Sequence, residues 1–184
     1  FRLEHVTYNE IFKLISSLKL DTSTGPDCIP VKYIKLVTTE ICSPVTHIIN
    51  SFIEQNKFPD TWKLSRICPI GKISNPLKHS DYRPISILPV LSKVFEKVVL
   101  QQLLDYINSH NLYKETLTGF RKGFSTGTAL LKLRDDIRKA MNSREITLVV
   151  LVDFSKAFDT IDHGILIKKL HKQGFSKSFL KWTL

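Results

Sequence analysis

One carboxylate in this sequence stands at the end of an apolar run, where a reaction could use it. Residues 146–152 read ITLVVLV, and Asp153 follows directly. A short run rich in β-branched side chains and free of charge is typical of a buried strand and too short for a helix. Because an ionised carboxylate is costly to bury without a partner, the pattern predicts a strand that delivers Asp153 to an open edge. There it would face a cation, hydrogen-bond donors or water, and the aromatic Phe158 should lie near the same edge.

The segment VDFSKAFDTIDH at residues 152–163 resembles the first palm motif of reverse transcriptases of non-LTR retrotransposons. Three other stretches resemble motifs of this family and follow the family's order: TGPDCIP at residues 24–30, YRPISILPVLSKVFEK at residues 82–97 and GFRKGFSTGTALL at residues 119–131. One such motif alone would be weak evidence, whereas four collinear motifs over most of the chain are strong. The resemblance implies a right-hand polymerase that performs RNA-directed DNA synthesis.

The resemblance also implies a role for Asp153 in binding two metal ions. The Asp153 carboxylate would bind both ions, the main-chain carbonyl of Phe154 would assist, and the other aspartates would come from an x-x-D-D hairpin that is absent from these 184 residues. Magnesium is the expected cofactor, with manganese as a substitute, because the ligands are oxygens and the substrate brings its own phosphates. The alternative is that Asp153 only caps the next helix.

Phe158 matches the position where the family places an aromatic plate under the incoming sugar. A rigid ring there would exclude a 2′-hydroxyl and so favour deoxynucleotides. Considered without the resemblance, Phe158 is more typical of core packing. Asp159 and Asp162 are expected in the first turn of the following helix rather than as metal ligands.

Two basic residues are candidates for binding the nucleotide. Arg83, in the stretch YRPIS, matches a family position that grips the triphosphate, and a guanidinium can bond two phosphate oxygens at once. Lys72, in the stretch PIGK, aligns with a basic residue of the partner strand, although the family has a denser basic run there. Residues 65–70 and 82–88 are the expected strands of this hairpin. As isolated residues, both cations would be ordinary surface charges.

Two further cations are candidates for template or primer binding. In the stretch GFRKG, glycines bracket Arg121 and Lys122 just before a helix that Ser125 or Thr126 should cap. The free N–H groups of a helix N-terminus suit a phosphate. By resemblance this stretch lies along the template or primer backbone, and the alternative is a helix-start turn with solvated cations.

Helical patterns account for most of the remaining chain. A T-x-x-E capping box starts at Thr7, and Pro30 and Pro44 should each open a further helix. Four later helices are expected at about residues 89–108, 126–141 and 162–173, and from residue 176 onward. The turn GPD at residues 25–27 is followed by Cys28, where the family often has glycine, which argues against a left-handed backbone there.

We therefore expect an α+β fold that is helix-rich, comprising the fingers and the start of the palm of a right-hand polymerase. Residues 1–112 would form the fingers and N-terminal helices, and residues 113–184 the first part of the palm. The chain lacks an initiating methionine, and an apolar helical rhythm still runs at Trp182. Both observations predict a piece truncated at both ends.

Composition narrows the class of protein. The net charge is +10, and residues 61–140 hold 14 basic and 6 acidic side chains, a bias that suits phosphate binding or a solvated lysine-rich surface equally. Three cysteines without CxxC spacing argue against a disulfide framework or a zinc site. Without a signal peptide or a membrane span, an intracellular protein of the nucleus or cytoplasm is expected.

The function predicted from the sequence is that of a reverse transcriptase fragment. Its intact parent would extend a DNA primer on an RNA template with deoxynucleoside triphosphates, by two-metal nucleotidyl transfer and without a membrane partner. The fragment alone should bind nucleic acid weakly and synthesise nothing. Two alternatives are a non-catalytic remnant that only binds nucleic acid, and an unrelated basic α/β protein that uses Asp153 in another metal-dependent reaction.

Overall fold

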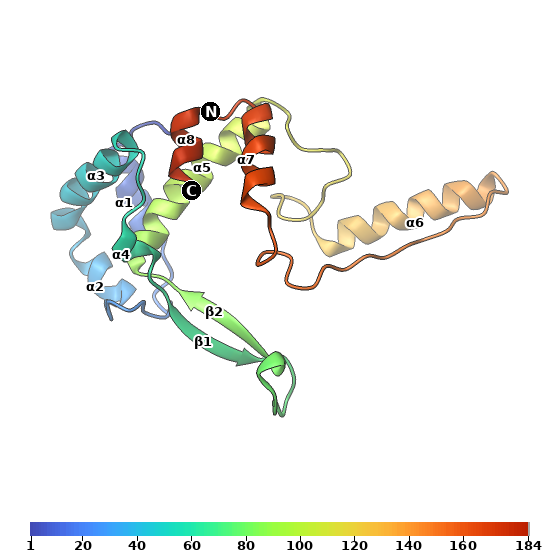
Figure 1. Ribbon diagram of the computed structural model, residues 1–184, viewed down its shortest axis with the longest axis horizontal. Coiled ribbons are helices and arrows are strands. Elements are labelled where there is room, and N and C mark those ends of the chain that lie inside the picture. The colour runs from blue at the N-terminus through green and yellow to red at the C-terminus, as the bar shows by residue number, and fades with distance from the viewer. Residues whose placement is uncertain (184) are drawn as a thin grey trace. The chain divides into compact units, whose positions relative to one another are not determined.

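The structure is a computed structural model that describes residues 1–183, and it is helix-rich with one small sheet (Figure 1). The elements are, in chain order, α1 (Tyr8–Ser16), α2 (Val31–Leu36), α3 (Thr38–Glu54), α4 (Asp60–Lys63), β1 (Arg66–Gly71), the 3-10 helix η1 (His79–Asp81), β2 (Tyr82–Ile87), α5 (Val90–Ser109), α6 (Thr126–Asn142), α7 (His163–Lys172) and α8 (Lys177–Trp182). No helix within residues 1–183 is both long and apolar enough to cross a membrane.

The chain divides into two compact units. The first contains residues 1–106 and 167–184, and the second contains residues 107–166. The first unit holds the hydrophobic core, which includes the fully buried side chains of Ile11, Ile15, Ile49 and Phe95. The second unit holds α6, none of whose side chains is buried.

The first helix forms where its capping box predicts. The Thr7 hydroxyl accepts a hydrogen bond from the Glu10 backbone N–H at 3.3 Å, and Glu10 Oε2 accepts one from the Thr7 N–H at 2.7 Å. These two bonds satisfy N–H groups that a helix start leaves free. Ile11 and Ile15 then lie on the buried face of α1.

The prediction that Pro44 opens a helix is wrong, because α3 already begins at Thr38 and Pro44 lies inside it. A proline inside a helix removes one backbone hydrogen bond. Helix α3 continues through that gap because it buries an apolar stripe that includes Cys42, Val45 and Ile49. Pro30 does stand at a helix start, as the N-cap of α2.

The predicted hairpin is confirmed, with strand limits that differ by one residue. Strands β1 and β2 pair antiparallel, with Ile70 opposite Arg83 and Pro69 opposite Pro84. Residues opposite each other share a face, and faces alternate along a strand. Arg83 therefore shares its face with Ile70, while Tyr82 and the two prolines lie on the other face.

The four later helices are confirmed. Helix α5 buries Phe95 in its second turn, and α6 starts at the N-cap Ser125, whose hydroxyl accepts the Thr128 N–H at 3.2 Å. Asp162 Oδ1 accepts the Ile165 N–H at 2.9 Å at the start of α7. After α7, Gly174 adopts a φ of +84°, the left-handed conformation that commonly ends a helix.

Two local predictions are corrected. Residues 146–152 do not form a strand: they are extended without ladder hydrogen bonds, and Ile146 and Leu151 are 100% and 89% exposed. A strand needs a neighbour to pair with its N–H and C=O groups, and no partner strand for this run exists within residues 1–183. Cys28 does adopt a left-handed backbone, with φ of 54°, where its N–H donates to the Gly25 carbonyl at 3.2 Å.

Candidate functional site

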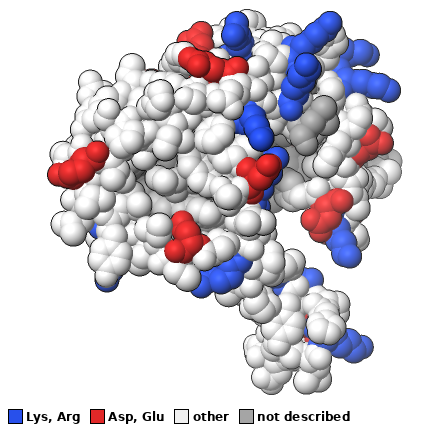
Figure 2. All heavy atoms as spheres, turned by 60° about the vertical axis from the view of Figure 1, so that its left-hand side comes forward, with Lys and Arg blue, Asp and Glu red and all other residues white. Residues whose placement is uncertain are grey.

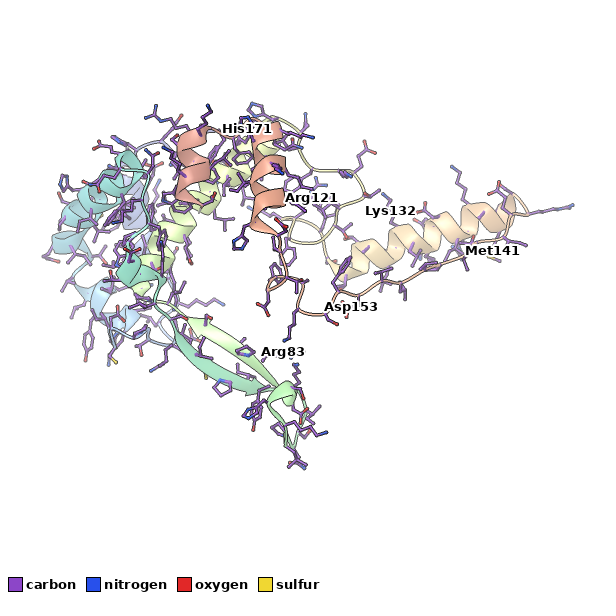
Figure 3. The ribbon with its side chains drawn as sticks, in the orientation of Figure 1. Arg83, Arg121, Lys132, Met141, Asp153 and His171 are labelled. Carbon is purple, nitrogen blue, oxygen red and sulfur yellow. The ribbon has the colours of Figure 1, made fainter. Side chains whose placement is uncertain are left out.

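Arg83 projects from β2 of the hairpin, which belongs to the first unit (Figure 3). Its side chain is exposed, and within residues 1–183 it makes no hydrogen bond or ion pair. The hairpin segment from residue 66 to 87 carries Arg66, Lys72, Lys78 and Arg83 against the single acid Asp81. On the face shown in Figure 2, basic side chains accordingly stand out on the projecting hairpin. Arg83 is thus a free guanidinium in a positive setting, which suits a phosphate ligand.

Lys72 lies one residue beyond β1, and its side chain is engaged in the hairpin loop. Its Nζ donates to the Ser80 carbonyl at 2.6 Å. The Asp81 carboxylate accepts the backbone N–H groups of Lys78 at 2.9 Å and Leu77 at 3.1 Å. These N–H groups stabilise the charged carboxylate and lower the pKa of Asp81. The loop is therefore stabilised by its own polar groups, and the Lys72 ammonium already bonds within the loop in addition to any contact that it makes with a ligand.

A hollow of about 500 Å³ lies beside the hairpin, lined by Pro69, His79, Tyr82 and Pro84. The strand alternation that puts Arg83 on one face puts the prolines and Tyr82 on the other. One face of the hairpin thus offers the charge of Arg83, and the other offers the uncharged rings of Tyr82 and the two prolines.

Asp153 lies in the second unit, on an extended segment between α6 and α7 (Figure 3). Its carboxylate is exposed, so the expectation that it ends a buried strand is wrong here. Within residues 1–183 no three His, Cys, Asp or Glu side chains gather closely enough to hold a metal ion. A single carboxylate supplies at most two of the six oxygen ligands that Mg²⁺ takes, and the others would come from water, phosphates or further protein groups. The described residues therefore do not fit a complete metal site.

Phe158 lies in a turn of the second unit and is 76% exposed. Its ring meets that of Phe120 edge to face, with centroids 6.3 Å apart. Phe120 comes from the GFRKG stretch, so the ring contact joins two of the motifs found in the sequence. Phe158 is not a core residue in this structure.

Arg121 makes more contacts than an ordinary surface cation. Its guanidinium lies 4.7 Å from the ring centroid of Tyr113 and 4.5 Å from that of Phe124. Its Nη1 donates to the Leu117 carbonyl at 3.3 Å. Lys122, in contrast, is exposed and has no partner in the part of the chain that the structure describes. The two neighbours thus differ: Arg121 organises the loop, and Lys122 is free for a ligand.

Arg121 also lines a hollow of about 320 Å³ in the second unit, together with Asn108, Asn111, Tyr113 and Glu115. The contacts of Tyr113 and Phe124 with Arg121 were not predicted from the sequence. The sequence does carry a pattern typical of such contacts, because two aromatic residues flank the arginine within twelve positions.

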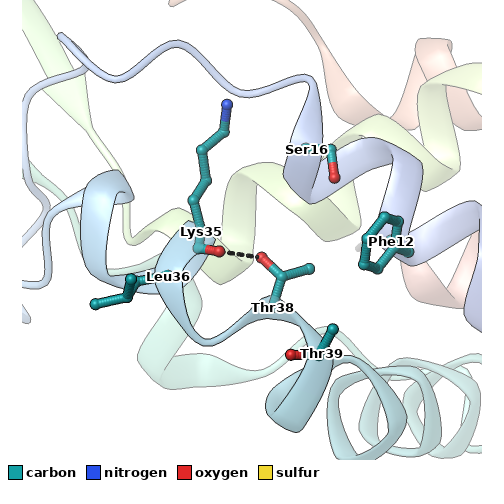
Figure 4. A pocket seen from close by; sticks show the side chains of 6 residues that line it. All are labelled: Phe12, Ser16, Lys35, Leu36, Thr38 and Thr39. Carbon is teal, nitrogen blue, oxygen red and sulfur yellow. Dashed lines mark hydrogen bonds between the residues drawn. The ribbon is translucent and has the colours of Figure 1, made fainter.

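A third hollow, of about 330 Å³, lies among α1, α2 and α3 (Figure 4). Its walls are formed by Phe12, Ser16, Lys35, Leu36, Thr38 and Thr39. The Thr38 hydroxyl donates to the Lys35 carbonyl at 2.8 Å, a bond that joins α2 to the start of α3. None of the predicted site residues lies here, and the lining has no acid that could pair with Lys35.

Residues 70–184 match the protein family described as reverse transcriptase (RNA-dependent DNA polymerase). The chain is 30% identical to a probable RNA-directed DNA polymerase from transposon BS of Drosophila melanogaster, over 97% of this chain and 20% of that protein. It is also 30% identical to the RNA-directed DNA polymerase from mobile element jockey of the same organism, over 90% of this chain and 18% of that protein. The chain thus spans about a fifth of the length of these relatives.

Proposed function

Because the chain belongs to the reverse transcriptase family, in its non-LTR retrotransposon branch, we propose that it supplies the nucleotide-binding hairpin and the first palm motif of an RNA-directed DNA polymerase. The observation that carries this proposal is the β1–β2 hairpin, which presents Arg83 as an unpaired, exposed guanidinium. The parent enzyme extends a DNA primer on an RNA template with deoxynucleoside triphosphates.

In this proposal Arg83 binds the triphosphate of the incoming nucleotide. An arginine is always charged, and its planar group can bond two phosphate oxygens at once. Lys72 acts mainly by shaping the hairpin loop, through its bond to the Ser80 carbonyl, and adds positive charge near the triphosphate. Lys122 contacts a phosphate of the template or primer backbone, and Arg121 holds the loop that presents it.

The role of Asp153 rests on the family's first palm motif. Magnesium, with manganese as a substitute, is the cofactor that the family implies, with Asp153 and the carbonyl of Phe154 as ligands. The isolated Asp153 carboxylate does not by itself form such a site. Phe158 is proposed to lie against the sugar and exclude a 2′-hydroxyl. Residues 1–112 correspond to the fingers and residues 113–184 to the beginning of the palm.

The test is primer extension by a full-length polymerase that contains this chain. Arg83→Ala should raise KM for deoxynucleotides at least tenfold and leave nucleic-acid affinity nearly unchanged, because the removed contact involves only the triphosphate. Arg66→Ala is the matched control, since Arg66 is an exposed arginine at the root of the same hairpin. Equal losses in nucleotide and template affinity would move Arg83 to the template path.

A second pair of variants separates synthesis from binding. Asp153→Asn should abolish extension while nucleic-acid binding persists, because the isosteric amide removes only the charge. Phe158→Ala should allow ribonucleotides to be incorporated. A polymerase with normal activity after Asp153→Asn would refute the assignment of this segment to the catalytic site.

A further inference from the structure

The root of the β1–β2 hairpin is held by residues that the proposed function leaves without a role. We propose that Gly25, Ser92 and Lys93 form a clamp that sets the direction of the hairpin, and that they are positioning residues for Arg83. The inference deepens the proposed function, on which the role of Arg83 rests. All three residues of the clamp, and the hairpin, lie in the first unit.

Gly25 presses against the backbone that leaves β2. A Cβ atom added at Gly25 would lie 2.6 Å from the Pro89 nitrogen and 2.7 Å from the Leu88 carbonyl carbon. Both are main-chain atoms, which cannot swing aside as a flexible side chain can. Gly25 is buried, and β2 ends two residues before Pro89, at Ile87. The TGPD turn is therefore packed directly onto the exit of the hairpin.

Two polar contacts complete the clamp, and both come from the first turn of α5. Lys93 Nζ donates to the Ser23 carbonyl at 3.2 Å, which ties α5 to the segment that carries Gly25. The Ser92 hydroxyl, fully buried, donates to the Trp62 carbonyl at 3.1 Å. Trp62 lies in α4, four residues before β1 begins. The segment that leads into β1 and the turn that packs on the exit of β2 are thus both fastened to the first turn of α5.

The clamp acts on Arg83 by leverage. Relieving the 2.6 Å contact to an ordinary 3.4 Å requires a shift of about 0.8 Å at the root. Across the roughly 4.8 Å between paired strands this is a tilt of about 10°. Arg83 lies four residues from the end of β2, about 13 Å at strand rise, so it moves by about 2 Å, and the tip of the hairpin moves by about 3 Å. Displacements of this size are large for a group that must meet a phosphate.

The direct test measures the hairpin position by electron–electron spin distances. Labels are carried by unnatural amino acids at positions 36 and 77, because Leu36 and Leu77 are 79% and 92% exposed and lie in the helical body and the hairpin loop. Gly25→Ala should shift the mean distance by about 3 Å or broaden its distribution by that amount. Gly127→Ala is the control, because its new Cβ would meet only the Ser125 Oγ at 3.4 Å.

A second variant keeps the proposal testable if Gly25→Ala does not fold, as judged by circular dichroism. The double variant Ser92→Ala, Lys93→Met removes the two polar contacts without a steric clash, and it should broaden the distance distribution. Ser51→Ala is its control, since the Ser51 hydroxyl bonds a carbonyl of its own helix at 2.9 Å. Distances that stay unchanged in a folded Gly25→Ala protein, or in the double variant, overturn the clamp.

A kinetic arm links the clamp to the reaction. In the full-length polymerase, Gly25→Ala should raise the deoxynucleotide KM about tenfold while the Kd for primer–template is unchanged. A shifted hairpin with unchanged KM would support the clamp and overturn the role of Arg83 in nucleotide binding. The two proposals therefore fail separately.

Discussion

Replacing Arg121 with lysine keeps the charge of the loop before α6 and removes the planar guanidinium that contacts the rings of Tyr113 and Phe124. Each arginine–ring contact at a partly exposed site is worth about 0.5–1 kcal/mol. With Tyr113 at 4.7 Å and Phe124 at 4.5 Å, Arg121→Ala should weaken the loop by about 1–2 kcal/mol. Arg121→Lys should lose roughly half of that, because an ammonium cannot lie flat against both rings.

The assay is hydrogen exchange of two amides within this loop. The Phe124 N–H donates to the Arg121 carbonyl at 3.2 Å, and the Leu117 N–H donates to the Lys114 carbonyl at 3.0 Å. A loss of about 1–2 kcal/mol should speed their exchange by about 5- to 30-fold in Arg121→Ala. Lys122→Ala is the control and should leave both rates unchanged, since Lys122 has no partner within residues 1–183.

Salt-dependent nucleic-acid binding separates the two cations further. Removing a single phosphate contact lowers the slope of log K against log salt by about 0.7–0.9. Lys122→Ala should show that decrease, whereas Arg121→Lys should keep the slope because its charge remains. Exchange rates that change less than twofold in Arg121→Ala, or equal slope changes in both variants, would refute the division of roles.

Three other predictions concern the first unit. Phe95→Ala should lower the free energy of unfolding by about 3–5 kcal/mol in urea titrations, because the fully buried ring stacks on that of Phe58 with centroids 5.3 Å apart. A loss below about 1 kcal/mol would contradict that packing. Cys28→Gly should leave stability equal or raise it by about 0.5 kcal/mol, since φ is 54°, whereas the β-branched Cys28→Val should lower it by more than about 1 kcal/mol. The pKa of Glu10 is lowered mainly by the hydrogen bond from the Thr7 backbone N–H. The wild type should therefore be more stable than Glu10→Gln above about pH 4.5, and this difference should vanish as the pH falls through the lowered pKa. A stability difference that persists in acid would exclude this cause.

The local elements of this protein could be predicted from sequence because their determinants are close together in the chain. The capping box at Thr7 and the cap at Ser125 each depend on groups three residues apart, and the strands β1 and β2 are joined directly by the loop of residues 72–81. The family also followed from sequence alone, since its motifs are short, ordered stretches. The comparisons confirmed that identification.

The tertiary structure decided what depends on distant partners. Residues 146–152 have the composition of a strand, yet they remain an unpaired extended segment because a strand forms only beside another one. Helix α3 runs through Pro44 because burial of its apolar face outweighs one missing hydrogen bond. The packing of Gly25 against Leu88 and Pro89, more than sixty residues away, has no local signature. Such contacts are set by how elements pack, and packing is the property that a linear pattern does not specify.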